Sequence, residues 1–173
     1  MDRKKPNELY AYCTEESEEG IFKSINNGVS WKIIFPVKDI ATLTINPMDS
    51  SIYIIGQQHT YRSIDGGQIW DTMKNAFPND IMINTLAIDP VHSSTLYIGT
   101  NYGIFKSIDR GREWLKINKG LPENIFVRTM VVNQQNSDII YIGTNYDGIF
   151  ISINGGVSWQ QINNGLPCSP GIG

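Results

Sequence analysis

One eight-residue pattern occurs four times in this chain, and it constrains the fold more than any other feature. The pattern is Ser-Ile-[Asp/Asn]-x-Gly-x-x-Trp, at residues 24–31, 63–70, 107–114 and 152–159. It contains all four tryptophans of the chain, which are 39, 44 and 45 residues apart. Self-similarity at this spacing is typical of a repeat architecture, in which neighbouring units bury each other's apolar faces.

Each repeat contains four short segments with the composition of β-strands. In the third and most regular repeat these are residues 85–90, 95–100, 103–108 and 113–117. They are rich in Ile, Leu, Thr and aromatic residues, and Gly, Pro, Asn or Asp bounds each of them. Four antiparallel strands in about 40–45 residues are the signature of a β-propeller blade. We therefore predict an all-β fold made of propeller blades.

About four blades are visible, and we expect them to form a single domain, with approximate boundaries at residues 1–36, 37–80, 81–124 and 125–173. The first is incomplete, because residues 8–12 align with a second strand and Met1 and Asp2 fall on the end of a first strand. This predicts about fifteen strands, with the innermost strand of the first blade missing. Three arrangements remain open: part of a longer propeller, a closed ring of four blades, or a ring completed by a second copy.

The repeated pattern lies between the third and fourth strands of each blade and is expected to close a hairpin. The Asp or Asn oxygen accepts hydrogen bonds from nearby backbone N–H groups, the Gly supplies a positive φ, and the Trp covers the hairpin. Asn replaces Asp at two sites, an exchange that a metal or catalytic site would tolerate poorly. The pattern is therefore predicted to be structural at Ser24, Asn26, Gly28, Trp31, Ser63, Asp65, Gly67, Trp70, Ser107, Asp109, Gly111, Trp114, Ser152, Asn154, Gly156 and Trp159.

Ser-x-Asp-x-Gly-x-x-Trp resembles the Asp-box, or bacterial neuraminidase repeat, and the resemblance covers nearly the whole chain. Residues 86–107 look most like the sortilin-type, xyloglucanase-type and photosystem II assembly factor-like branches. The resemblance implies a β-propeller whose Asp-boxes lie away from the ligand-binding face. It does not specify a function, because such propellers include sialidases, glucan hydrolases, sorting receptors and assembly factors.

The candidate ligand-binding residues lie in the loops that join the second and third strands, at the rim opposite the repeated turns. Loops on one face of a rigid scaffold commonly carry function. Asn-Tyr recurs there and offers an aromatic ring with an amide, as a sugar or peptide site would, although Asn-Tyr-Gly is also a good turn sequence. The candidates are Gln57, Gln58, His59, Asn101, Tyr102, Asn145, Tyr146 and Asp147.

The chain shows no recognisable catalytic constellation. Glycoside hydrolysis needs a pair of carboxylates across the sugar, and the acids near the rim are Asp39, Asp80, Glu123 and Asp147, none of them in a known catalytic setting. Arg62 and Arg128 are too few for a sialidase-type arginine cluster. We expect no cofactor or metal, and predict a non-catalytic module that binds protein or carbohydrate. The alternative is a fragment of an Asp-box glycoside hydrolase of xyloglucanase or sialidase type, with its second carboxylate elsewhere.

Net charge and hydropathy argue against some classes of partner. The net charge is −3 and the only basic cluster is residues 3–5, which is too short for a nucleic-acid footprint. No apolar run is long enough to cross a membrane, and no signal peptide is recognised, so the compartment stays open. A second copy, or the rest of a longer propeller, is an expected partner. Cys13 and Cys168 are either unrelated thiols or, in a closed ring, a bridge.

Overall fold

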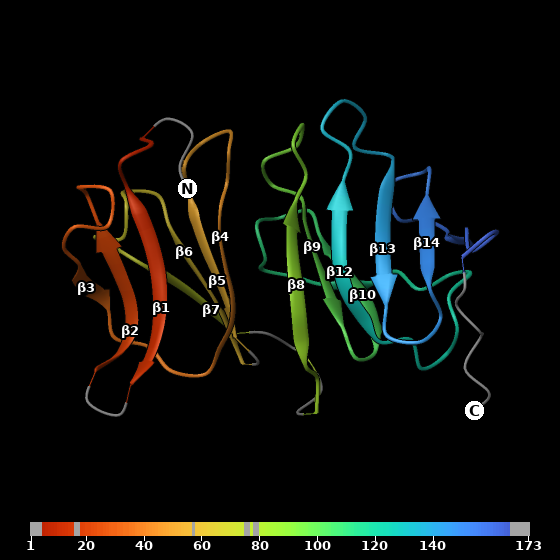
Figure 1. Cartoon of the computed structure of the whole chain (residues 1–173), viewed down its shortest axis with the longest axis horizontal. Coiled ribbons are helices and arrows are strands. Elements are labelled where there is room, and N and C mark those ends of the chain that lie inside the picture. Colours follow the sequence, from red (N-terminus) through yellow and green to blue (C-terminus); the bar gives the residue numbers. More distant parts are fainter. Residues whose placement is uncertain (1–4, 16–17, 57, 75–76, 78–79, 167–173) are drawn as a thin grey trace. The chain divides into compact units, whose positions relative to one another are not determined.

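The computed structural model describes residues 5–15, 18–56, 58–74, 77 and 80–166. Within them the chain forms fifteen β-strands and no helix, and the strands make four antiparallel sheets (Figure 1). Each sheet is one propeller blade. The all-β prediction is confirmed.

Residues 1–74 and 75–173 form two compact units, here called unit 1 and unit 2. Unit 1 contains blades 1 and 2. Blade 1 has three strands in the order β1-β2-β3, and blade 2 has four in the order β4-β5-β6-β7. Their bounds are β1 Leu9–Glu15, β2 Glu18–Ser24, β3 Lys32–Phe35, β4 Ile40–Ile45, β5 Ile52–Gly56, β6 His59–Ser63 and β7 Asp71–Lys74.

Unit 2 contains blades 3 and 4, each with four strands in chain order. The first strands β8 and β12 contact each other, so these two blades pack side by side (Figure 1). The bounds in this unit are β8 Ile83–Ile88, β9 Leu96–Thr100, β10 Gly103–Ser107, β11 Leu115–Lys116, β12 Val127–Val132, β13 Ile140–Thr144, β14 Ile149–Ser152 and β15 Gln160–Gln161.

The core of each unit lies between its two blades. In unit 1 it includes Ile21 of blade 1 and Ile54 of blade 2; in unit 2 it includes Tyr97 and Ile104 of blade 3 with Phe150 of blade 4. β9 is buried along its whole length, which explains its almost uninterrupted apolar sequence. The fourth strands β11 and β15 are exposed sheet edges and are only two residues long, which limits pairing with other chains.

The strand order agrees with the prediction in its main features. Blade 1 has three strands among the described residues, and Met1 and Asp2, expected at the end of a first strand, lie outside the described residues. The fourth strand of blade 3 is shorter than the expected 113–117, because the Asp109 carboxylate holds the N–H groups of Arg112 and Glu113 in the turn. Cys13 is exposed, and Cys168 also lies outside the described residues.

Candidate functional site

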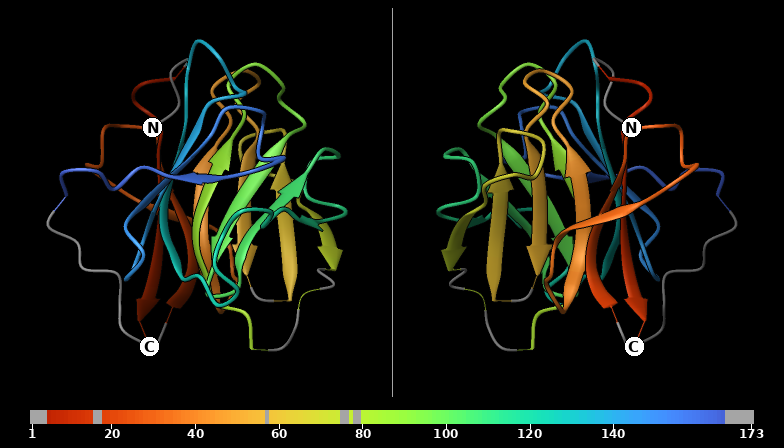
Figure 2. Two further views of the ribbon diagram at one scale, coloured as in Figure 1. Left: turned by 90° about the vertical axis from the view of Figure 1, so that its right-hand side faces the viewer. Right: turned by 90° about the vertical axis from the view of Figure 1, so that its left-hand side faces the viewer.

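Connections gather at the two ends of the strands in each blade, as Figure 2 shows. The Ser-Ile-[Asp/Asn] turns follow the third strand at one end. The hairpins between the second and third strands lie at the other end, here called the rim. A five-residue strand such as β10 separates the two ends by roughly 16 Å. A ligand held at the rim therefore does not touch the repeated turns.

The four turns share one hydrogen-bond arrangement. In each turn, a buried serine hydroxyl donates a hydrogen bond to the Asp or Asn side-chain oxygen. The same hydroxyl accepts one from the backbone N–H of the glycine that lies two residues after that Asp or Asn. The Asp or Asn oxygen also accepts a hydrogen bond from the backbone N–H four residues further along the chain. The Glu113 N–H donates to Asp109 in this way, and the Ser158 N–H donates to Asn154. The serine hydroxyls and the Asp or Asn oxygens are therefore occupied by contacts within their own turns.

Asp109 and Asp65 have pKa values below the ordinary range for aspartate. At Asp109 burial alone would raise the pKa, but hydrogen bonds from the Glu113 N–H, the Ser107 hydroxyl and the Arg112 N–H outweigh it. At Asp65 the Ile69 N–H makes the largest contribution to the lowered pKa. Donors that favour the ionised form keep both carboxylates charged, so neither is suited to donate a proton.

The rim hairpin of blade 3 is held internally. The Asn101 backbone N–H donates to the Met82 carbonyl, and its side-chain amide donates to the Asp80 carbonyl and accepts from the Met82 N–H. The Tyr102 hydroxyl donates to the Asp80 carboxylate, which raises the pKa of Tyr102. Asn118 spans the hairpin, accepting from the Ile104 N–H and donating to the Tyr102 carbonyl. The predicted pair Asn101 and Tyr102 is therefore committed to its own blade.

Blade 4 repeats this arrangement with small changes. The Asn145 backbone N–H donates to the Phe126 carbonyl, and its side-chain oxygen accepts from Arg128. Asn163 takes the place of Asn118, accepting from the Ile149 N–H and donating to the Asp147 carbonyl. The Tyr146 side chain is 71% exposed. Of the candidate residues in unit 2, Tyr146 is the side chain most available to a ligand.

Asn118 and Asn163 were not among the predicted site residues, although a sequence signal for them exists. Both stand in Ile-Asn-x-Gly-Leu-Pro, which occurs after the fourth strand of blades 3 and 4. Gly103 and Gly148 have φ values of 99° and 78°, and a Cβ at either would overlap the side chain of the corresponding asparagine. In both blades the asparagine side chain packs against a glycine that has no Cβ, and this contact fixes the rim hairpin.

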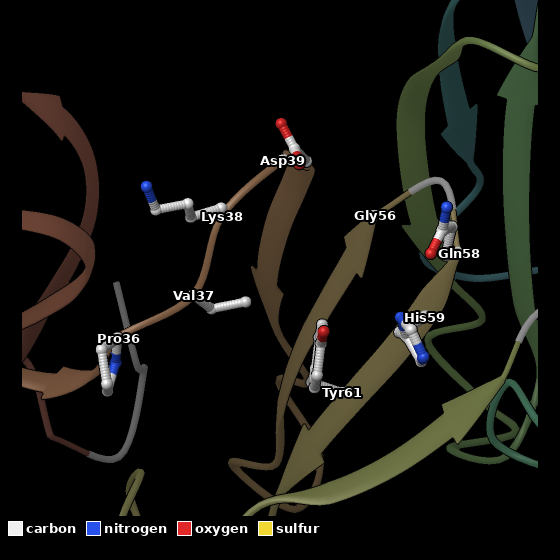
Figure 3. A pocket seen from close by; sticks show the side chains of 8 residues that line it. All are labelled: Pro36, Val37, Lys38, Asp39, Gly56, Gln58, His59 and Tyr61. Atoms are coloured by element: carbon white, nitrogen blue, oxygen red, sulfur yellow. The ribbon is translucent and has the colours of Figure 1, made fainter. Parts of the chain in front are cut away.

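Unit 1 has an open pocket at its rim. The pocket has a volume of about 410 Å³ and lies between the connection from β3 to β4 and the β5–β6 hairpin (Figure 3). Val37 is buried and takes part in the core of unit 1 beneath the pocket. Tyr61 and His59 line the opposite side, with ring centroids 5.8 Å apart. Predicted residues Gln58 and His59 line this pocket, whereas Gln57 lies outside the described residues.

Charges of both signs border this pocket. Lys38 is largely exposed and its Nζ lies 3.7 Å from the Glu19 carboxylate, while Asp39 follows it directly. Asp39 has a φ of 56°, a left-handed conformation that aspartate adopts more readily than most residues. Sequence reasoning considered Asp39 only as an acid and missed Val37, Lys38 and Tyr61. Their proximity depends on the path of the β3–β4 connection, which strand and turn signals in the sequence do not specify.

Two observations bear on metal and acid–base chemistry in the described part of the chain. No group of three or more His, Cys, Asp or Glu residues that could hold a metal ion occurs in that part of the chain. The carboxyl groups with shifted pKa values are Glu8, Asp65, Asp89 and Asp109, and all four are lowered.

No helix long and apolar enough to span a membrane is present in the described part of the chain.

No known protein-family model and no curated protein matches the sequence. Solved structures do match. The GH74 xyloglucanase from Xanthomonas campestris superposes with a TM-score of 0.72 at 18% identity, over 92% of this chain and 29% of that chain. YCF48 from Cyanidioschyzon merolae gives 0.66 at 12% identity, over 96% and 56%. YCF48 bound to a D1 peptide gives 0.66 at 14% identity, over 90% and 49%.

These likenesses concern the fold. Because all the sequence identities are below one quarter, the matches support the architecture and not the activity. The chain also spans only part of those proteins, from about a quarter to a little over half of their length. The similar structures include enzymes of family GH74 as well as YCF48, so similarity does not choose between catalysis and binding. The chain is a set of β-propeller blades.

Proposed function

We propose that this chain is a non-catalytic binding module of the Asp-box propeller type, and that its ligand is a polypeptide segment held at the rim of unit 1. The observation that carries the proposal is the open pocket of about 410 Å³ lined by Val37, His59 and Tyr61. A pocket with an apolar floor and a few convergent polar groups is the usual form of a binding site. The corresponding hairpins in unit 2 are tied to their own blades instead.

The Asp-box assignment is supported by the uniform turns. In all four the serine hydroxyl donates to the side-chain oxygen of the third residue, whether that residue is Asp65, Asp109, Asn26 or Asn154. A contact that survives exchange of a charged for a neutral side chain supports a role in structure. The function is then expected at the rim.

A polypeptide suits the pocket better than a neutral sugar. Lys38 and Asp39 present opposite charges at its edge, which a peptide backbone and side chains can complement. Sugars are commonly stacked on an exposed aromatic face, but the Tyr61 ring already contacts Phe35, with centroids 5.2 Å apart, and His59. A glycan is the second ligand class to test.

The proposal can be tested with a random heptapeptide phage library panned on the full chain. We expect a peptide consensus that is lost on Val37→Asp and weakened at least tenfold on His59→Ala, because both side chains line the pocket. Tyr146→Ala is the matched control, since Tyr146 lies in the equivalent hairpin of blade 4 and should leave binding unchanged. Enrichment that persists on Val37→Asp, or that is lost on Tyr146→Ala, would place the ligand elsewhere.

The glycoside hydrolase alternative is tested separately with xyloglucan oligosaccharides. The binding proposal expects no release of reducing sugar by the wild-type chain. Release that disappears in Asp80→Asn, Glu123→Gln or Asp147→Asn would favour the enzyme, with that acid as one of its carboxylates. Saturable oligosaccharide binding without release, lost on His59→Ala, would keep the pocket and replace the peptide with a glycan.

A further inference from the structure

The two charged residues at the mouth of the unit 1 pocket are not equivalent. Lys38 is 77% exposed, and its Nζ lies 3.7 Å from the Glu19 carboxylate of blade 1. Figure 3 shows the Lys38 side chain directed away from Tyr61 and His59. The charge of Lys38 is therefore compensated outside the pocket, by a residue that does not line it.

Asp39 is the charged side chain that stays available to a ligand. It lines the pocket, and its carboxylate has no hydrogen-bond or ion-pair partner in the part of the chain that the structure describes. Its backbone is held by the neighbouring hairpin, because a Cβ on Gly56 would lie only 2.8 Å from the Asp39 carbonyl oxygen. With Lys38 paired to Glu19, the mouth of the pocket carries one uncompensated negative charge.

The backbone at this position does not require a carboxylate. Asp39 has a φ of 56°, and asparagine adopts this left-handed conformation as readily as aspartate. In blades 3 and 4, Met82 and Phe126 stand at the corresponding position, directly before the first strand. The acid is therefore a departure from the repeat, and turn geometry alone does not account for its charge.

The floor of the pocket is apolar and aromatic. Val37 is buried in the core of unit 1, and the Tyr61 ring lies beside the His59 ring. Among the residues that the structure describes, the Tyr61 hydroxyl and the His59 ring nitrogens have no hydrogen-bond partner. An alkyl chain can lie on such a floor while a cation at its end stays in water at the mouth, as lysine and arginine side chains commonly do.

We propose, building on the peptide-binding function proposed above, that the unit 1 pocket takes a lysine or arginine side chain of the peptide. Its alkyl stem lies on Val37 and Tyr61, and its cation lies beside Asp39. An aromatic ring next to the cation adds to the attraction. The buried Val37 supplies the apolar floor, so an acid at that position would remove the floor, whereas the exposed Asp39 meets the cation at the mouth.

The proposal is tested by NMR titration of the full chain with four blocked peptides of the form acetyl-Ala-Ala-X-Ala-Ala-amide. X is lysine, arginine, norleucine or glutamate, and the blocked ends remove the terminal charges. Norleucine keeps the alkyl stem of lysine without its charge. We expect the lysine and arginine peptides to shift the resonances of His59 and Tyr61 and to bind about fivefold more tightly than the norleucine peptide, as for an exposed ion pair. The glutamate peptide should bind most weakly.

Three variants locate the charge that is responsible. Asp39→Asn keeps the left-handed backbone and should reduce binding of the lysine peptide to that of the norleucine peptide, whose own affinity should not change. Lys38→Gln should act in the opposite direction and strengthen lysine-peptide binding about twofold, because it leaves Glu19 unpaired near the mouth. Asp71→Asn is the matched control: it removes the same charge from an exposed position in blade 2, at the opposite end of the strands, and should change nothing.

Opposite effects of Asp39→Asn and Lys38→Gln, with no effect of the control, support the basic side chain. Equal affinity for the lysine and norleucine peptides, or a preference for glutamate, overturns it and leaves peptide binding at the pocket intact. An unchanged affinity of Asp39→Asn for the lysine peptide also overturns it. If none of the four peptides shifts the His59 and Tyr61 resonances at millimolar concentration, the peptide-binding function fails together with this proposal.

Discussion

The two ends of the strands in these blades follow different rules. At one end, four turns repeat the same hydrogen bonds around Ser24, Ser63, Ser107 and Ser152. At the rim the hairpins diverge: those of blades 3 and 4 are held by Asn118 and Asn163, while the hairpin of blade 2 borders an open pocket. The uniform end maintains the repeat. The divergent end is where one blade can acquire a property that the others lack.

The difference also shows why repetition is a poor guide to a binding site. Asn-Tyr recurs in blades 3 and 4, yet the Asn101 and Asn145 side chains are used to hold their own loops. The hairpin of blade 2, which has His59 at the position of Gly103, lines an open pocket. A residue that recurs in the same contacts in every blade serves the fold, and departures from the repeat are better candidates for function.

The largest effect is expected from Gly148→Ala at the rim of blade 4. Alanine at positive φ costs about 1–2 kcal/mol, and its Cβ would displace Asn163, with the loss of hydrogen bonds worth about 1 kcal/mol each. We expect a loss of about 3 kcal/mol in the free energy of unfolding measured in urea. Gly165→Ala is the control, because Gly165 also has positive φ but open space around it, and should cost about 1 kcal/mol. Equal costs would show that Asn163 does not hold the hairpin.

At the turn end, Ser152→Ala should cost about 2 kcal/mol, because it leaves the buried Gly156 N–H without its acceptor. Ser107→Ala should cost about the same, since the contacts are repeated. Ser158→Ala removes one exposed hydrogen bond from Asn154 and should cost about 0.5 kcal/mol. Denaturant unfolding followed by tryptophan fluorescence gives all three values. A clear difference between Ser152→Ala and Ser107→Ala would contradict the uniformity of the turns.

A smaller, pH-dependent effect is expected from Asp109→Asn. The folded-state pKa of Asp109 is lowered, so its contribution to stability is present above the unfolded pKa and is lost as pH falls through the folded value. The variant lacks this contribution, so it should be slightly less stable than the wild type near neutral pH, and the difference should shrink as pH falls below about 4. The reverse change, Asn154→Asp, should add acid sensitivity to blade 4. Parallel pH profiles for all three proteins would rule out a stabilising role for ionised Asp109.

The smallest stability effect is expected from His59→Ala in the pocket. Its ring is only partly buried and lies against Tyr61, so we expect a change of less than about 0.5 kcal/mol in unfolding free energy. The same variant should weaken peptide binding at least tenfold. Thermal unfolding and a binding titration on one preparation separate the two effects. A destabilisation of several kcal/mol would mean that the hairpin of blade 2 is held as tightly as those of unit 2.

Most of the fold could be predicted from the sequence because its signals are local and repeated. The tryptophan spacing, the strand composition and the turn residues together led to fifteen antiparallel strands with a three-stranded first blade. The lengths of the last strands were less predictable. β11 begins only at Leu115, since Asp109 retains the residues before it in the turn. Strand propensities do not account for such competition, in which a side chain takes backbone N–H groups that the sheet would otherwise use.

The sequence by itself determined the blades and the turns that contain Asp or Asn, and it predicted a ligand site at the rim. Only the tertiary structure decided which rim residues are available. Asn101 and Tyr102 contact Asp80, more than twenty residues earlier, and Val37 approaches Tyr61 through packing between two blades. The same holds for Tyr97 and Tyr141, which occupy equivalent positions in their blades but differ in exposure. Turn chemistry depends on residues within a few positions of each other, whereas availability depends on which neighbouring blade covers a side chain.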